Sequence, residues 1–178
     1  MKLGRLIARI FVGALFVGHG TQKWFGWFGG PGLDKTSKSM EALGMRPGRA
    51  NAHAAAASET LGGAALALGA FTPAAAATLI GTMVTAIRTV HLEKGFWAAN
   101  GGYEFNLTLI AALLAIVDGG PGPLSIDGAL GLDDTGHGWA LAALAAGVAG
   151  STLAMAAGAR AGGTDTVPAA EQGTPDRS

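Results

Sequence analysis

The sequence predicts an all-α protein embedded in a membrane, a four-helix bundle with an additional transmembrane helix on its C-terminal side. Of the 178 residues, 49% are hydrophobic and only 13% are charged, whereas soluble domains average about 25% charged residues. The charges gather in a few stretches, and long runs of Ala, Leu, Gly, Ile and Val separate them. Such runs are typical of helices that cross a bilayer.

The composition also excludes several functions. The 12 Lys and Arg balance the 12 Asp and Glu, so no basic excess exists to attract nucleic acid. The chain has no Cys, which excludes disulfides, thiolate nucleophiles, iron–sulfur clusters and Cys-based zinc sites. It also excludes the reactive Cys pair with which small membrane bundles pass electrons between thiols and quinones. We expect no metal site.

The first expected span runs from Leu3 to about Phe28 and contains Arg5 and Arg9 near its start. Basic residues before an apolar run also begin a signal peptide. However, no small-x-small cleavage site follows Val17, so we expect a retained helix. The aromatic residues of Trp24–Phe28 stand where an interfacial belt would lie.

Four further spans are expected, over residues 51–70, 74–91, 103–117 and 139–159. The last of them carries no charge over about 20 residues, the length that a helix needs to cross a bilayer. Small residues recur in it every four positions and favour helix packing; they are Ala146, Gly150, Ala154 and Gly158. The chain is thus divided into a four-helix core (1–130), a fifth helix with its connection (131–159) and a disordered polar tail (160–178).

A polar segment, Leu33 to Gly48, connects the first two spans. Asp34 is placed to cap a short helix that ends at Gly44. We expect this helix to lie along the membrane surface, and an unstructured loop is the alternative.

The loop charges predict an orientation. The connections after the first and third spans carry most of the basic residues: Lys23, Lys35, Lys38, Arg46, Arg49 and Lys94. The connection after the fourth span has only acidic charges: Asp118, Asp127, Asp133 and Asp134. The positive-inside rule therefore places the first and third connections, and the tail, in the cytoplasm, although Lys2 and Arg5 favour the opposite orientation.

Charged residues inside apolar spans normally face the bundle interior or a cavity. Two cations and two anions stand out within the expected spans: Arg9, Glu59, Arg88 and Glu104. At about 1.5 Å per residue, Arg9 lies ~24 Å from Phe25, and Glu59 lies ~18 Å from Pro47 on the same membrane face, so their depths agree to within about one helical turn. We therefore expect two buried pairs, Arg9 with Glu59 and Arg88 with Glu104.

The topology brings one end of each of the first four spans to the same membrane face. A cluster is expected to converge there and to open toward a cavity: His19, Lys23, Arg88, His91, Asn100 and Glu104, with Glu59 deeper. Together with Arg9, these residues form the candidate intramembrane ligand site. The alternative is that they only form inter-helix pairs and caps that fix the packing.

The run from Gly18 to Gly32 resembles the first-helix motif of the DoxX family. Further stretches resemble its later motifs in the same order: Glu59–Gly63 with Leu68–Gly69, Thr89–His91 with Asn100–Glu104, and Gly120–Gly122 with Ser125–Asp127. The ordered set extends from about Arg5 to Leu130, while the fifth span and the tail depart from the family pattern.

The resemblance implies a bacterial inner-membrane protein with several spans and a four-helix core. Some members are linked to a quinol oxidase or a thiosulfate:quinone oxidoreductase, and one mycobacterial member is associated with soluble enzymes in a membrane complex. The resemblance thus implies a component of a quinone-linked oxidoreductase system. Its partners would be the lipid bilayer, membrane or soluble oxidoreductase subunits, or a second copy of the chain.

A quinone head group is expected near His19, His91 or Glu104, where ionisable side chains would also relay protons. A haem held by His19 and His91 is disfavoured, because both residues lie near the interface and not at mid-membrane. Two other functions stay open. One is a bundle that binds or transports a small lipophile without chemistry of its own, and the other is a scaffold for a soluble oxidoreductase.

Overall fold

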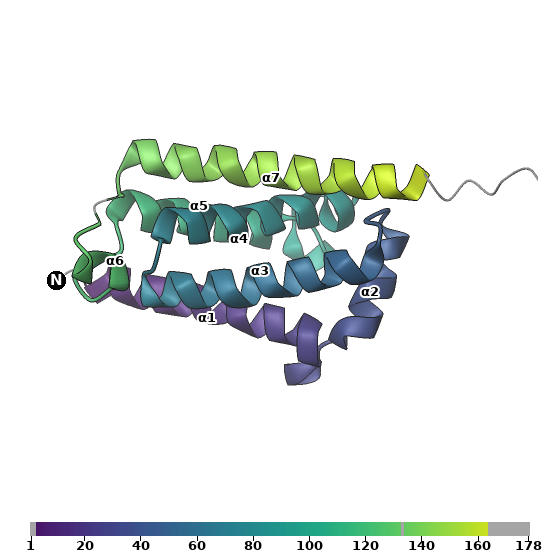
Figure 1. Cartoon of the computed structure of the whole chain (residues 1–178), viewed down its shortest axis with the longest axis horizontal. Coiled ribbons are helices and arrows are strands. Elements are labelled where there is room, and N and C mark those ends of the chain that lie inside the picture. Colours follow the sequence, from purple (N-terminus) through teal and green to yellow (C-terminus); the bar gives the residue numbers. More distant parts are fainter. Residues whose placement is uncertain (1–2, 133, 164–178) are drawn as a thin grey trace, which may run out of the picture.

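The computed structural model describes residues 3–132 and 134–163, and every regular element within these ranges is helical. Five long helices lie along a common axis and alternate in direction along the chain (Figure 1). They are α1 (Leu3–Phe25), α3 (Gly48–Leu68), α4 (Thr72–Ala86), α5 (Glu104–Gly119) and α7 (His137–Gly163). The predicted all-α class is confirmed.

Three of the described helices are long and apolar enough to cross a membrane: Leu3–Phe25, the continuous run Thr72–Lys94, and His137–Ala161. The second is α4 together with the helical turns η2 (Ile87–His91) and η3 (Leu92–Lys94) that extend it. The other two long helices differ from these. α5 has only 16 residues, and α3, although 21 residues long, is rich in Ala and contains polar and charged residues.

The closest packing in the bundle joins α1 to α3 through glycines. A Cβ on Gly13 would lie 2.5 Å from the carbonyl oxygen of Gly63, so the two backbones touch. Phe16 and Leu66 are fully buried beside this contact. Gly13, Phe16 and Gly20 all lie on the buried face of α1.

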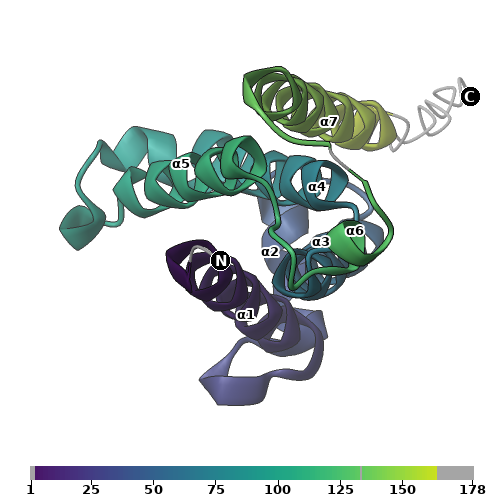
Figure 2. The same ribbon diagram turned by 90° about the vertical axis from the view of Figure 1, so that its left-hand side faces the viewer.

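Seen along the axis, α7 lies next to α4 and outside the group formed by the other long helices (Figure 2). The contact with α4 is made by Gly147, where a Cβ would lie 2.7 Å from Ile80. Gly158 packs against the backbone of Met45, but a Cβ on Gly150 would meet nothing within 4 Å. The expected small-residue packing surface is therefore corrected: Gly147 replaces Gly150 in the contact.

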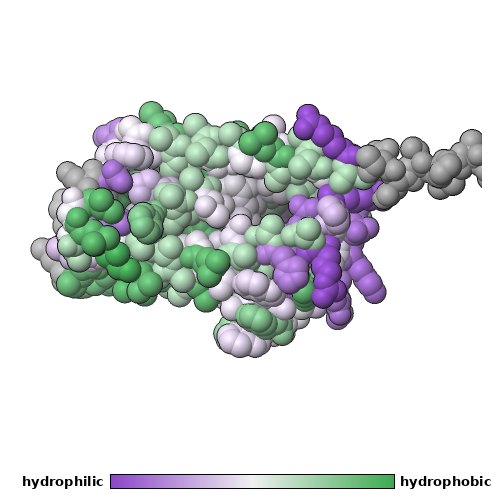
Figure 3. Space-filling view, in the orientation of Figure 1, coloured by the Kyte–Doolittle hydropathy of each residue, from purple (hydrophilic) through white to green (hydrophobic). Residues whose placement is uncertain are grey.

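The polar connection after α1 contains the helix α2 (Gly32–Ala42), which lies across one end of the bundle (Figure 1). Figure 3 shows that hydrophilic residues gather at this end. Asp34 does not cap α2 as expected, because the helix begins earlier and Pro31 is its N-cap. Asp34 lies instead in the first turn, where it faces Arg49 on α3 at 3.6 Å.

The C-terminal side differs from the expected boundaries. A short helix, α6 (Ile126–Ala129), lies in the connection between α5 and α7. α7 continues to Gly163, so residues 160–163 are helical and not part of a disordered tail. The rest of the predicted tail, residues 164–178, lies outside the described residues.

Candidate functional site

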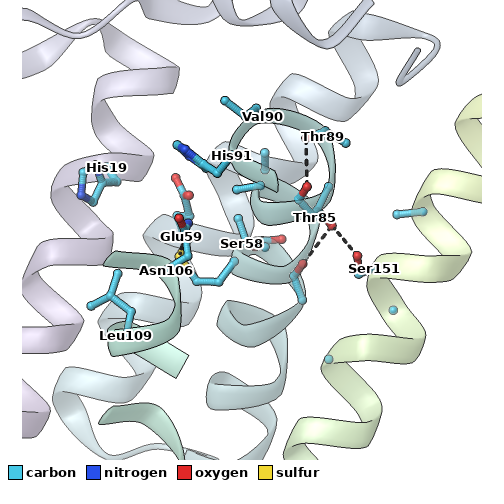
Figure 4. A pocket seen from close by; sticks show the side chains of 18 of the residues that line it. His19, Ser58, Glu59, Thr85, Thr89, Val90, His91, Asn106, Leu109 and Ser151 are labelled. Carbon is cyan, nitrogen blue, oxygen red and sulfur yellow. Dashed lines mark hydrogen bonds between the residues drawn. The ribbon is translucent and has the colours of Figure 1, made fainter. Parts of the chain in front are cut away.

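A cavity of about 870 Å³ lies at the α2 end of the bundle (Figure 4). Its volume is in the range of sites that bind small molecules, roughly 300–1,000 Å³. Five long helices and α2 contribute to its lining, most of which is apolar or small. The ionisable and amide side chains in the lining are those of His19, Lys23, Asn51, Glu59, His91 and Asn106.

The electrostatic centre of the cavity is an ion pair between α1 and α3. Lys23 Nζ lies 2.5 Å from Glu59 Oε2. The Glu59 side chain is only 3% exposed, while that of Lys23 is 26% exposed. The close packing of α1 on α3 at Gly20, one turn before Lys23, brings the two side chains together. Because a buried charge is costly without its partner, removal of either residue should destabilise the contact between α1 and α3.

His91 is positioned by an irregular turn. Residues Ile87–His91 form a π-helix, a widened turn that is frequently found at functional sites. His91 Nδ1 lies 2.7 Å from the carbonyl oxygen of Gly101. Because a carbonyl oxygen only accepts hydrogen bonds, Nδ1 carries the hydrogen. In the neutral ring, Nε2 is then an acceptor.

Two residues at the start of α5 complete this part of the cavity. Asn106 is 6% exposed, and its Nδ2 lies 3.4 Å from the sulfur of Met83. Phe105 meets the ring of His19 edge-on, with the centroids 6.4 Å apart. Asn106 was not predicted as a site residue, although an amide within a run of apolar residues indicates a polar site inside the bundle.

A second part of the cavity lies between α4 and α7. The hydroxyl oxygens of Thr85 and Ser151 form a hydrogen bond of 2.9 Å (Figure 4). Arg88 Nη1 donates to Thr152 Oγ1 at 2.9 Å and to Ser151 at 3.4 Å. The sequence analysis gave α7 no role in the site, and no charged or His residue in 139–159 pointed to one.

Four of the eight predicted site residues line the cavity: His19, Lys23, Glu59 and His91. The expected pair of Arg88 with Glu104 is wrong. Arg88 faces α7, while the Glu104 carboxylate accepts from the amide of Ala98 at 2.9 Å. Asn100 is exposed in the turn η4 (Ala98–Asn100) and is not a lining residue.

The expected pair of Arg9 with Glu59 is also wrong. Arg9 lies toward the other end, where its Nε donates to Ala67 at 3.2 Å and its Nη2 to Leu124 at 2.6 Å. Its Nη1 donates to the carbonyl of Pro121. The expected pairing assumed that Phe25 and Pro47 lie at the same depth in the membrane. In the structure, the first turns of α3 pack on α2, beyond the end of α1, so Glu59 lies level with the last turns of α1.

Asp127 stabilises the same end as Arg9. Its carboxylate accepts from the amides of Phe71 and Thr72 at 2.6 and 2.9 Å, and from the Thr72 hydroxyl at 2.7 Å. These bonds satisfy amides at the start of α4, which have no partner within the helix. They also hold Phe71 in a left-handed conformation, with φ of 47°, that non-glycine residues seldom adopt. Arg9 and Asp127 therefore fix packing.

Among the described residues, no group of three or more His, Asp or Glu is placed to hold a metal ion. The expectation about metals concerned the whole chain and stays a prediction.

The chain matches the DoxX family over residues 4–92, which is half of its length. It is also similar to an uncharacterized protein of Haemophilus influenzae, with 28% identity over 124 residues that cover 68% of this chain and 80% of the relative. No solved structure matches it. The family match includes Lys23, Glu59 and His91, while Asn106 and Ser151 lie beyond it. The chain belongs to the DoxX family of membrane proteins.

Proposed function

We propose that this DoxX-family protein binds the head group of a lipophilic quinone-like molecule beside the Lys23–Glu59 pair, as a component of a quinone-linked oxidoreductase system. The observation that carries the proposal is a buried carboxylate, 3% exposed and 2.5 Å from an ammonium, in the wall of a cavity of about 870 Å³. Such groups within apolar helices mark ligand and proton pathways.

The chemistry of the lining suits both redox forms of a quinone. The Lys23 ammonium and the Asn106 amide are donors that suit the two carbonyl oxygens of the oxidised ring. The Glu59 carboxylate and Nε2 of His91 are acceptors that suit the hydroxyls of the quinol. Reduction of a quinone to a quinol takes up two electrons and two protons. In this proposal a partner oxidoreductase supplies the electrons, and the ionisable residues of the cavity relay the protons.

The proposal includes a placement in the bacterial inner membrane, with all five long helices crossing the bilayer as a four-helix core and an added α7. α5 is about 24 Å long at 1.5 Å per residue, and tilt or local thinning of the bilayer accommodates such a short helix. The α2 end, which carries the basic connections, is placed in the cytoplasm.

A second candidate function is binding or transport of a lipophile without redox chemistry. The observation that favours it is that Lys23 and Glu59 already neutralise each other at 2.5 Å. A site that is neutral in this way suits a ligand whose charge does not change. The two candidates share the binding site, but only the quinone-linked candidate predicts turnover of a quinone or quinol.

The test is equilibrium binding of a benzoquinone with a decyl chain to the protein purified in mild detergent. We expect saturable binding that the double variant Lys23→Met/Glu59→Gln weakens at least tenfold, which corresponds to about 1.4 kcal/mol. The matched control is Asp34→Asn/Arg49→Gln, which neutralises an exposed ion pair at the same end of the bundle. Equal affinity in both double variants would refute the proposed site.

Turnover separates the two candidate functions. Membranes that contain the protein and its co-purifying partners should oxidise the corresponding quinol, or reduce the quinone, at a rate that falls in Lys23→Met/Glu59→Gln. Binding without any such difference in rate favours the non-redox candidate.

A further inference from the structure

We infer that the cavity takes a lipophile of two parts: a ring head beside Lys23 and Glu59, and a linear hydrocarbon tail in a groove that α3 and α7 form on either side of α4. The inference rests on the proposed function for the head group. It adds the class of the molecule, which is a ring with an alkyl or isoprenoid chain, and the route by which its tail reaches the bilayer.

The groove is the part of the cavity that faces away from α1 and α5. In Figure 1, α3 and α7 lie on opposite sides of α4. The lining residues of the two walls are mostly small, so they leave room above α4; they are Ala54, Ala55 and Ser58 on α3, and Ala146, Gly150 and Ala154 on α7. Thr78, Gly81 and Thr82 of α4 form the floor.

The floor is compatible with hydrocarbon in spite of its threonines. The Thr78 hydroxyl donates to the carbonyl of Ala74 at 3.0 Å, and that of Thr82 donates to Thr78 at 3.2 Å. Threonine hydroxyls bonded in this way to their own helix need no further partner in an apolar medium. Their methyl groups are then free to contact a ligand.

The groove is accessible from the side of the bundle. Ala54, Thr78, Ala146, Gly150 and Ala154 are all exposed, although they line the cavity. α4 and α7 are part of the helices that are long and apolar enough to cross a membrane, so an exposed residue at this level faces lipid. A tail in the groove can therefore continue into the bilayer.

The two parts of the cavity meet near Ser58. In Figure 4, Ser58 lies between Glu59 and Asn106 on one side and the Thr85–Ser151 pair on the other. From Thr78 to Thr89 the floor is about 16 Å long at 1.5 Å per residue. Side chains at the α2 end close it there: Met40, Leu43 and Met45. The tail consequently runs toward the middle of the bilayer while the head stays near the α2 end, which is the orientation of membrane lipids.

Gly150 provides the test, because a Cβ on it meets nothing within 4 Å and a side chain placed there therefore starts in open space. Its neighbour Ala149 is exposed on α7 but does not line the cavity, so it gives the matched control. The probes are a benzoquinone with a decyl chain and the same ring with a methyl group only. We expect Gly150→Leu to weaken binding of the tailed probe about tenfold and to leave the tailless probe unchanged, while Ala149→Leu affects neither.

A second readout locates the tail directly. Since the chain has no native Cys, Gly150→Cys and Ala149→Cys each give a single labelling site. The tailed probe should slow labelling of Gly150→Cys by a thiol reagent at least threefold. It should leave Ala149→Cys unaffected, and the tailless ring should slow neither.

The outcomes separate the inference from the proposed function. If the tailless ring binds as tightly as the tailed probe and Gly150→Leu changes neither, the head site stands and the tail groove is refuted. If neither quinone probe binds but decyl alcohol slows labelling of Gly150→Cys, the groove stands and the quinone assignment is refuted. If neither the two quinone probes nor decyl alcohol slows labelling of Gly150→Cys, the groove is refuted.

Discussion

At the end where α1 begins, Arg9 donates to three backbone carbonyls and Asp127 accepts from two backbone amides and a hydroxyl. At the α2 end, Lys23 and Glu59 instead pair with each other, side chain to side chain, in the wall of a cavity. Both pairs of residues lie in or beside apolar helices. They differ in what their polar atoms contact.

The role of a charge in an apolar helix therefore depends on whether its partners are backbone groups or another side chain. Helix ends and tight connections leave backbone groups without partners, and in lipid each such group is costly. Arg9 and Asp127 satisfy such groups in α3, at the start of α4 and in the connection between α5 and α7, so their role is complete within the fold. Among the residues that the structure describes, Lys23 and Glu59 satisfy only each other. A ligand can therefore compete for their hydrogen-bonding capacity.

The largest effect is expected for Arg9→Met, which removes the donors to Ala67, Pro121 and Leu124. The bond to Pro121 is buried and the other two are part-buried. A carbonyl left without a donor costs about 1–3 kcal/mol, so the loss of all three bonds should lower the free energy of unfolding by about 3 kcal/mol. Unfolding in a denaturing detergent measures it. The fraction that remains folded should bind the quinone probe with unchanged affinity. If Arg9→Met unfolded like the natural protein but no longer bound the probe, Arg9 would act in binding and not in packing.

An intermediate effect is expected for Glu59→Gln, which leaves the Lys23 ammonium without its anion. Removing one member of a buried pair costs about 3–5 kcal/mol, and the partial exposure of Lys23 places the expected loss near or below the lower limit. The double variant Lys23→Met/Glu59→Gln should recover most of this stability and still fail to bind the probe. Recovery of binding together with stability would mean that the pair only fixes packing.

The smallest effect is expected for Asp127→Asn. The amide keeps one acceptor oxygen for the start of α4, but its NH2 group replaces the other acceptor, and the charge that favours helix N-termini is lost. Unfolding should therefore become easier by about 1–2 kcal/mol. Probe affinity should not change, because Asp127 lies outside the cavity lining. The thermal midpoint and the binding isotherm of the same preparation check both statements.

The sequence was sufficient for the elements and for part of the site. Apolar runs located the long helices, and alternation of direction alone placed His19, Lys23 and His91 at one end. The partners of the charges depend on the helix register, however. The glycines at positions 13 and 20 indicate a close approach of another helix, but not which residues of that helix they meet. The Arg9–Glu59 error followed from this.

The other errors have similar causes. Arg88 lies in a π-helical turn, where a period of 3.6 residues no longer tells which neighbour a side chain faces. Ser151 enters the cavity only because α7 packs on α4, and residues 139–159 of α7 carry no charge to indicate which of its faces turns inward. Asn106 was visible in the sequence, but its importance depends on the cavity beside it.

The most direct test of the account is the rise in thermal midpoint that a saturating decyl benzoquinone produces in two variants. A ligand at about 100 times its Kd stabilises the folded state by roughly 2.7 kcal/mol, so binding gives a clear shift. We expect Asp127→Asn to lower the starting midpoint and keep the full shift, and Lys23→Met/Glu59→Gln to lose the shift. A full shift in Lys23→Met/Glu59→Gln, or its loss in Asp127→Asn, would contradict the assignment of binding to one end and packing to the other.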